Sequence, residues 1–230
     1  MRTLAIGDIH GCKMALETLL DSLELCEDDR LIFLGDYVDR GPDSRGVLEK
    51  LIELGANPRH VFLRGNHDDW MLRARGEYRW FNSWVGEGIG GRESLESYGA
   101  TSINLAALSL IPAAHWDFLA RTQLYFETTS AIFVHAAITS YNADLSDSHS
   151  MMWRSFWDNA PHLSGKRIVC GHTAQTSGVP GNQGFAVCID TFCGGPGGWL
   201  SALDVGSNEV FQANQNGETR RFYLGEAANP

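Results

Sequence analysis

The sequence predicts an α/β fold, and two observations support this prediction. In the first half, three segments repeat one pattern, in which a short apolar strand is followed by a polar, glycine-containing loop and then by a helical pattern. In the second half, short strand-like runs are separated by Gly, Asn and Pro. Successive strand-loop-helix units build a parallel sheet whose loops gather along one edge. No segment of the 230 residues looks like a linker, so we expect one domain over residues 1–230.

The repeated units occupy the first 75 residues. Each predicted strand ends at a loop with carboxylate, amide or imidazole side chains, which would meet at the carboxyl edge of the sheet. The units are a strand at 3–7 with the loop 7–11 and a helix to about 25, a strand at 31–34 with the loop 35–41 and a helix at about 44–54, and a strand at 61–63 with the loop 64–68 and a helix starting at 69–75.

The character of the chain changes between about residues 76 and 129. Aromatic residues sit there in helical-looking segments around the glycine-rich stretch 86–91, and no strand signal is convincing. We interpret this region as a helical insertion over the site. Its aromatic residues are expected to form a small core of their own, because basic residues do not interleave with them as they would in a base-stacking surface.

The α/β pattern resumes after the insertion. Strands at 131–134 and 167–171 lead directly to His135 and His172. The stretch 139–165 between them reads as polar and loop-like, with Trp153 and Trp157 as anchors. The remaining strands are expected at 185–189, 200–205, 209–212 and 221–224.

Composition and charge exclude several classes of function. The net charge of −10 argues against broad electrostatic attraction to nucleic acid or to an anionic membrane. The first strand leaves no room for a signal peptide, and the weakly polar run 103–114 is too short to span a bilayer. Five scattered cysteines without a CxxC pair favour free thiols in a reducing cytoplasm. An anionic substrate would therefore have to be attracted by local charge.

Polar side chains follow five of the predicted strands. Taken singly, each has an ordinary structural interpretation as a turn carboxylate, a turn amide or a core histidine, but together they predict one shared site. Carboxylates, an amide oxygen and imidazoles suit Mn, Fe, Co or Zn better than Mg or Ca. Two carboxylates, one amide oxygen and three of the four imidazoles already give six ligands, which exceed the need of one catalytic ion, whereas two ions sharing a bridging carboxylate would use them all. The side chains are Asp8, His10, Asp36, Asn66, His67, His135 and His172.

The same residues carry a family resemblance. Five motifs resemble, in order, those of the calcineurin-like metallophosphoesterases, and the unbroken Asp-Arg-Gly of the second motif resembles the phosphoprotein phosphatase branch. The resemblance implies a four-layer αββα sandwich of two mixed sheets with helices outside. The motifs are Gly-Asp-Ile-His-Gly (7–11), Gly-Asp-Tyr-Val-Asp-Arg-Gly (35–41), Gly-Asn-His-Asp (65–68), Val-His (134–135) and Gly-His-Thr (171–173).

The resemblance implies a role for each ligand. Asp8 and His10 would bind a first ion, Asp36 would bridge, and a second ion would be bound by Asn66, His135 and His172. We expect two divalent ions, Mn first, with Fe, Zn, Co and Ni as alternatives. Two such ions bring +4 and two carboxylates −2, so a surplus of +2 would attract phosphate and acidify a bridging water.

The resemblance also implies catalytic and substrate-binding residues. His67 would act as the general acid, oriented by Asp39. Arg40 would bind phosphate oxygens through its planar guanidinium, although a structural salt bridge to Asp36 or Asp43 is an alternative. Arg154, 19 residues after His135, is expected to be a second phosphate-binding residue. Arg64 is expected to support the loop and Tyr37 to pack.

The predicted reaction is hydrolysis of a phosphomonoester by a metal-bridging hydroxide. The expected substrate is a phosphoserine or phosphothreonine protein or a small phosphoester, with no nucleic acid or membrane partner; the oligomeric state stays open. The main alternative is hydrolysis of diadenosine tetraphosphate or another nucleotide anhydride. Asp39 favours the first reading, because bacterial symmetrical tetraphosphatases generally keep Ala-Arg-Gly there. A non-catalytic binding protein would not need this complete set.

Three departures from the family pattern bear on the substrate rather than on the ligands. Asp68 stands where eukaryotic protein phosphatases usually carry glutamate. Ala136 and Ala137 replace glycines that commonly follow the histidine, and Phe192 stands where small bacterial relatives often have glycine.

Overall fold

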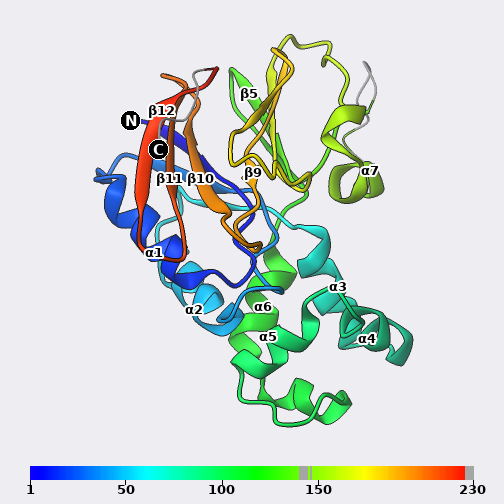
Figure 1. Ribbon diagram of the computed structural model, residues 1–230. Helices are drawn as coiled ribbons and strands as arrows, with labels where there is room; N and C mark the ends of the chain where they lie inside the picture. The colour runs from blue at the N-terminus through cyan, green and yellow to red at the C-terminus, as the bar shows by residue number, and fades with distance from the viewer. Residues whose placement is uncertain (140–144, 146, 226–230) are drawn as a thin grey trace.

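Two mixed β-sheets form the centre of the computed structural model, which describes residues 1–139, 145 and 147–225 (Figure 1). The first sheet has the order β12-β11-β10-β1-β2-β3, with β9 also beside β10, and the second has the order β4-β5-β6-β8-β7. The strands of the first sheet are β1 (Thr3–Ile6), β2 (Arg30–Phe33), β3 (Val61–Phe62), β9 (Asp190–Thr191), β10 (Trp199–Asp204), β11 (Glu209–Ala213) and β12 (Thr219–Tyr223). Those of the second are β4 (Tyr125–Glu127), β5 (Ala131–Val134), β6 (Arg167–Cys170), β7 (Gly181–Asn182) and β8 (Ala186–Cys188).

Helices cover the outer faces of the two sheets. In Figure 1 the first sheet lies between α1 and the second sheet, and α7 lies on the far side of the second sheet. The helices are α1 (Lys13–Ser22), α2 (Ser44–Leu54), α3 (Asn66–Ala74), α4 (Tyr78–Trp84), α5 (Gly91–Ser97), α6 (Ala113–Arg121) and α7 (Ser148–Trp153), with 3₁₀ helices η1 (Leu105–Leu110) and η2 (Phe156–Asp158). The predicted sandwich of two mixed sheets with helices outside is confirmed.

The alternation of side chains along the strands explains this layering. Leu4 and Ile6 belong to the core beneath the helices, whereas Ala5, between them, belongs to the core between the sheets. Successive side chains of a strand point to opposite faces, so a fully apolar strand fits a sheet that is covered on both sides. In the second sheet, Phe133 faces the inter-sheet core and Ile132 faces the core that contains part of α7.

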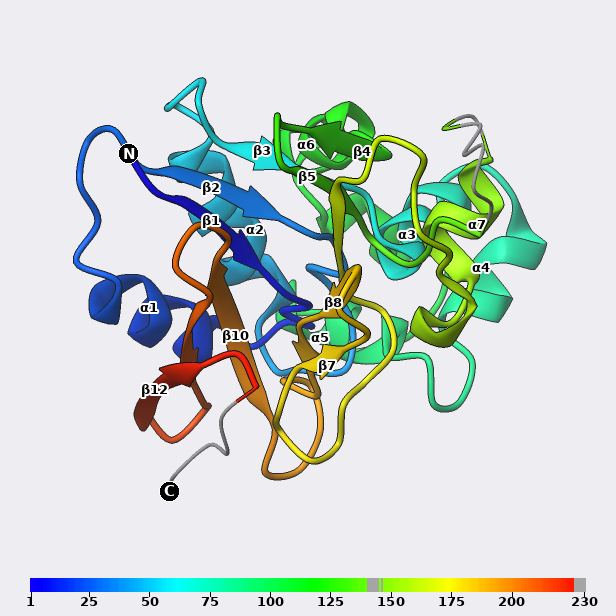
Figure 2. The same cartoon turned by 90° about the horizontal axis from the view of Figure 1, so that it is seen from above.

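The parallel part of the first sheet brings the predicted loops together. β1 pairs in parallel with β2, and β2 with β3, as the strand-loop-helix pattern predicted. In the second sheet β5 pairs in parallel with β6. The loops that follow these five strands therefore emerge at neighbouring carboxyl ends, which places the candidate site at one edge of the two sheets (Figure 2).

The region 76–129 is largely helical, as predicted, but two expectations about it were wrong. It ends in a short strand, β4, which pairs with β5; only three residues long and partly exposed, β4 lacks the apolar alternation that marks a strand in the sequence. Its aromatic residues do not form a separate core. Trp84 and Trp116 belong to the same buried cluster as Leu16 and Leu48 of α1 and α2, because the inserted helices pack against the helical face of the first sheet.

Several element boundaries differ from the predicted ones. α3 begins at Asn66, three residues earlier than predicted, so two candidate site residues lie in its first turn. α1 ends at Ser22 rather than near residue 25. The stretch 139–165, predicted as loop, contains α7 and η2, while residues 140–144 and 146 within it lie outside the described part of the chain. α2 has the predicted bounds, Ser44–Leu54.

An ion pair ties the start of β1 to the loop before β2. The Arg2 guanidinium donates to Asp29 at 2.6 and 3.1 Å, and the Arg2 backbone N–H donates to the same carboxylate at 2.9 Å. These hydrogen bonds hold the pKa of Asp29 well below its usual range. Asp29 is therefore charged in the folded state at neutral pH.

Two further observations concern the whole described chain. None of its helices is long and apolar enough to cross a membrane. All five cysteines are free thiols, as predicted.

Candidate metal centre

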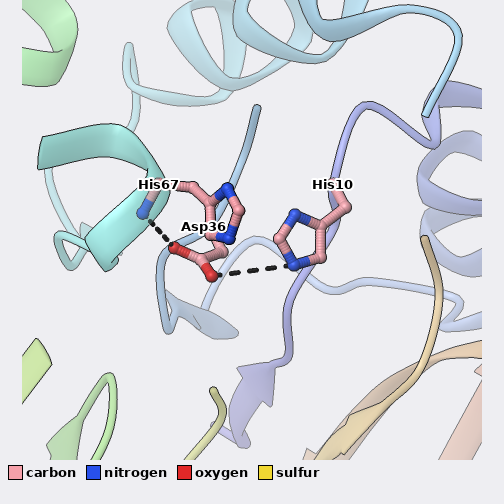
Figure 3. Close-up of side chains that lie close together, drawn as sticks. All are labelled: His10, Asp36 and His67. Carbon is pink, nitrogen blue, oxygen red and sulfur yellow. Dashed lines mark hydrogen bonds and ion pairs between the residues drawn. The ribbon is translucent and has the colours of Figure 1, made fainter. Parts of the chain in front are cut away.

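Asp36 lies at the centre of the candidate site. Its Oδ2 atom is 3.6 Å from Nε2 of His10, and its Oδ1 atom accepts the backbone N–H of His67 at 2.9 Å (Figure 3). The same Oδ2 atom is 3.5 Å from Nε2 of His135. One carboxylate oxygen thus faces an imidazole from each half of the chain. This is the position that a carboxylate bridging two ions would take.

Asn66 forms the second group of ligands with the histidines of the second sheet. Its Oδ1 atom is 3.0 Å from Nε2 of His135 and 2.8 Å from Nδ1 of His172. The ligand atoms of Asp36, His135 and His172 lie within 4.8 Å of one another. The structure therefore brings together the four residues expected to hold the second ion.

The chemistry of these donors fits a cation. Nδ1 of His135 is 2.9 Å from the carbonyl of Leu34, and Nδ1 of His10 is 3.0 Å from that of Val38. Since a carbonyl can only accept, Nδ1 carries the proton in both rings and Nε2 presents a lone pair. Burial lowers the pKa of both histidines, so the rings are neutral. Lone pairs on nitrogen thus face oxygen lone pairs of Asp36, an arrangement that a divalent cation stabilises.

His172 is also a neutral imidazole. Burial lowers its pKa to about 4, and a backbone group of Trp153 hydrogen bonds to its ring. Its backbone N–H donates to both carboxylate oxygens of Asp8, at 3.0 and 3.2 Å. Burial, with the nearby carboxylates of Asp190 and Asp36, raises the pKa of Asp8. A buried carboxylate among other carboxylates is costly unless a cation compensates it.

The first group of ligand atoms differs from the predicted one. In the described chain, the atoms that lie within 4.8 Å of one another around His10 and Asp36 include His67, and Asp8 is not among them. Asp8 lies against the backbone of Gly171 and His172. The assignment of Asp8 to the first ion therefore stays a prediction.

His67 and Asp39 form the predicted imidazole–carboxylate pair. Nδ1 of His67 lies 2.8 Å from Oδ2 of Asp39, and both side chains are buried. Burial by itself would lower the pKa of His67, but the negative charge of Asp36 and the hydrogen bond to Asp39 outweigh it and raise that pKa. With Nδ1–H donated to Asp39, the Nε2 atom is left to exchange a proton with a bound group.

The inserted helices hold Asp39 in place, a contribution that sequence reasoning missed. Trp84 Nε1 on α4 donates to both carboxylate oxygens, at 2.9 and 3.0 Å, and Ser94 Oγ on α5 donates at 2.7 Å. The inserted helices therefore hold the carboxylate of the candidate catalytic pair in place.

Arg40 lies against the two imidazoles of the first group. Its Nη1 atom is 2.8 Å from Nε2 of His10 and its Nη2 atom is 3.0 Å from Nε2 of His67. No salt bridge joins it to Asp36 or Asp43 in the described chain, and Asp43 caps α2 instead. An exposed guanidinium in this position can reach an anion bound between the histidines.

Two other arginines lie as follows. Arg154 follows α7 directly, beside Trp153, and is exposed; within the described residues its guanidinium has no hydrogen-bond or ion-pair partner. Its phosphate-binding role stays a prediction. Arg64 donates to Thr122 Oγ1 at 3.0 Å and to carbonyls of Leu119 and Ala120 at 3.1 and 3.0 Å, which fits the expected supporting role.

The backbone of the site is strained in several places. Five candidate site residues have positive φ angles, a conformation that residues with a Cβ rarely adopt. They are His10 (48°), Asp36 (52°), Asp39 (75°), Arg40 (68°) and His172 (65°). Asp68 stabilises part of this geometry, because its carboxylate accepts the backbone N–H groups of Asp36, Tyr37 and Gly65 at 2.8, 3.0 and 2.9 Å. The sequence marked Asp68 only as a departure from the family pattern.

Residues 1–176 match the family model described as calcineurin-like phosphoesterase. The chain belongs to this family. Among curated proteins, it is 46% identical over 73 residues to a symmetrical bis(5'-nucleosyl)-tetraphosphatase of Legionella pneumophila, and 49% identical over 73 residues to that of Erwinia tasmaniensis. Each match covers 31% of this chain and 26% of the relative, so the similarity spans about a quarter of the relatives' length.

Several solved structures share the fold of this chain. A "putative diadenosine tetraphosphatase" superposes with a TM-score of 0.64 at 22% identity, over 96% of this chain and 92% of the other. A cold-active protein-tyrosine phosphatase of a Shewanella species gives 0.63 at 18% identity, over 96% and 80%. A protein serine/threonine phosphatase of Saccharomyces cerevisiae gives 0.58 at 15% identity, over 100% and 81%. At these identities the likeness concerns the fold alone.

Proposed function

We propose that this chain is a metal-dependent hydrolase of dinucleoside tetraphosphates. The observation that supports metal-dependent hydrolysis is the position of Asp36 between imidazoles from both halves of the chain, because this position suits two ions sharing one carboxylate. Local identity of 46% to a symmetrical bis(5'-nucleosyl)-tetraphosphatase supports the substrate. Of the two readings that the sequence left open, these relatives favour the nucleotide anhydride over the phosphomonoester.

The side chains have separate roles in this proposal. Asp8, His10, Asp36, Asn66, His135 and His172 would hold two divalent ions, with Mn as the first expectation. Such ions, when bound, polarise phosphoryl oxygens and lower the pKa of water.

Side chains of the protein would bind the phosphate groups and transfer the proton. Arg40, near the Nε2 atoms of His10 and His67, would bind phosphate oxygens, and Arg154 would bind them from the second half. Asp39 holds Nδ1–H of His67, so that Nε2 would deliver its proton to the departing oxygen. The site would thus combine charge stabilisation with proton transfer.

The pair of His67 and Asp39 favours a second candidate, hydrolysis of phosphomonoesters including phosphoserine and phosphothreonine in proteins. An alkoxide leaving group needs a proton far more than a nucleoside diphosphate does. The buried carboxylate of Asp39, which accepts hydrogen bonds from three donors including His67, suits that need. Phosphorylated proteins are therefore the second class of substrate. Free thiols support a reducing, cytoplasmic location for either activity.

One experiment separates the two substrates. The metal-stripped protein is refilled with Mn, Co, Zn, Ni or Mg and given diadenosine tetraphosphate, a phosphoserine peptide and p-nitrophenyl phosphate side by side. We expect the highest kcat/KM with diadenosine tetraphosphate, with ADP as product. A higher kcat/KM for the phosphopeptide would overturn the first candidate in favour of the second, and absence of hydrolysis with every ion would overturn both.

The bridging position of Asp36 can be tested without turnover. Asp36→Asn replaces the carboxylate that lies between the two groups of candidate ligands with a neutral amide. Elemental analysis should therefore find fewer than two ions per chain. Asp117→Asn, a change of an exposed carboxylate on α6, is the matched control and should bind as the wild type does. A full complement of two ions in Asp36→Asn would argue against bridging.

A further inference from the structure

A row of aromatic rings runs from the candidate general acid toward the surface. The ring of Trp70 meets His67 edge to face, with centroids 5.4 Å apart at 87°. Trp153 meets Trp70 at 5.0 Å and 77°, and His149 lies 6.4 Å beyond it at 17°. The row therefore starts at the imidazole that would face the leaving group.

The two tryptophans come from opposite halves of the chain. Trp70 lies three residues after His67 on α3, so both side chains are on one face of that helix. Trp153 is the last residue of α7, which packs beside the second sheet. α3 and α7 lie on the same side of the molecule in Figures 1 and 2. The pair thus spans the junction between the two halves next to the site.

The tryptophan pair differs in exposure from two other indoles of the chain. Trp84 and Trp116 are buried, whereas Trp70, which packs against the edge of the main core, and Trp153 are partly exposed. His149 lies nearly parallel to the Trp153 ring, and the accessible parts of the two indoles can contact another planar group. Partly exposed aromatic rings beside a catalytic imidazole are suited to bind part of the substrate.

The charge next to the pair indicates the kind of substrate. Arg154 follows Trp153 directly, is exposed, and has no partner for its guanidinium among the described residues. A planar ring on an indole with an anion on a neighbouring guanidinium matches a nucleotide, whose base stacks while its phosphates pair with the cation.

We infer that Trp70 and Trp153 bind the nucleobase of the substrate on the leaving-group side of the site. The inference rests on the proposed function, because it assigns the base of a nucleotide substrate to the same site. The two tryptophans would then be substrate-binding residues that select nucleotides over simple phosphoesters. Stacking on an aromatic side chain is tolerant of base identity, so any base should serve.

The test compares two ligands that differ only in the base. Calorimetry on the Mn-loaded protein measures the dissociation constants of AMP and of ribose 5-phosphate. We expect AMP to bind roughly tenfold more tightly, the effect of one stacked base. In Trp153→Ala this ratio should fall toward one, and Trp153→Phe should keep most of it. Trp157→Ala, which removes an exposed indole outside the pair, is the matched control and should keep the wild-type ratio.

A second readout tests whether the base contacts the tryptophan pair. AMP should quench tryptophan fluorescence, ribose 5-phosphate should not, and the quenching should be lost in a Trp70→Phe, Trp153→Phe protein while it persists in Trp157→Phe. Equal dissociation constants for the two ligands in the wild type would overturn the inference, even if diadenosine tetraphosphate were hydrolysed.

The inference and the proposed function can fail separately. If diadenosine tetraphosphate is not a substrate but AMP still binds more tightly than ribose 5-phosphate through Trp153, the function fails and the base site stands. A loss in Trp153→Ala seen only with a phosphotyrosine peptide, and not with AMP, would assign the pair to a peptide ring and refute a nucleobase site.

Discussion

Replacing Asp39 tests both the support of the catalytic pair and its chemistry. This buried carboxylate accepts hydrogen bonds from His67 Nδ1, Trp84 Nε1 and Ser94 Oγ. Asp39→Ala would leave these three donors without their acceptor. A buried donor left unsatisfied costs about 1–3 kcal/mol, so the free energy of unfolding should fall by at least about 3 kcal/mol. Asp39→Asn keeps one oxygen for Trp84 and Ser94, so the loss should be about 1–2 kcal/mol. Urea unfolding measures both.

Asp39→Asn should lower kcat most for substrates whose leaving group must be protonated. The neutral amide removes the charge-assisted hydrogen bond to His67, worth about 1.5–3 kcal/mol, which corresponds to roughly 10- to 150-fold in rate. The full loss is expected for alkyl phosphoesters, whose alkoxides need protonation, and a much smaller loss for p-nitrophenyl phosphate. The assay is kcat across a series of leaving groups, with Asp117→Asn as control.

Two results would refute this reasoning. An equal fall in kcat for every leaving group would mean that Asp39 does not act through proton transfer by His67. An Asp39→Ala protein as stable as the wild type would mean that the three hydrogen bonds contribute nothing to the folded state.

Three further changes test other parts of the structure. Arg154→Ala should raise KM and the inhibition constant of free phosphate together, several-fold; unchanged values would exclude a phosphate contact. In Gly65→Ala the new Cβ would lie 2.0 Å from Oδ1 of Asp36, which should lower Tm and metal content, whereas Gly76→Ala, with its nearest neighbour at 3.8 Å, should be tolerated. The depressed pKa of Asp29 means that its stabilisation is present above about pH 4 and is lost as pH falls through the folded-state pKa. The stability difference between wild type and Asp29→Asn should therefore shrink in urea titrations from pH 6 to pH 3, and a constant difference would contradict the ion pair.

The sequence by itself was enough to predict the fold class and most of the residues that gather at the candidate centre. Asp36 and Asn66 each follow the strand of a successive strand-loop-helix unit. Parallel strands place such loops at the same edge of the sheet, whatever the details of packing. Motif order added the histidines of the second half. The fold prediction succeeded because it depends on local pattern and on general rules of connection, whereas the assigned roles of the site residues stay predictions.

Only the tertiary structure showed which residues support the candidate site. Trp84 and Ser94 reach Asp39 across 45 and 55 residues, and Trp70 meets Trp153 from another element altogether. Hydrophobic periodicity indicates that such a side chain is buried, but burial does not name its partner, because the choice depends on how separately formed helices dock.

The same limit applies to backbone conformation. The positive φ angles of Asp36 and Asp39 are held by hydrogen bonds from elsewhere, and residues with a Cβ give no sign of this conformation in the sequence. Local pattern thus determined the strands, their loops and the candidate ligands. Long-range packing determined the strained geometry, the support behind Asp39 and the aromatic surface beside His67.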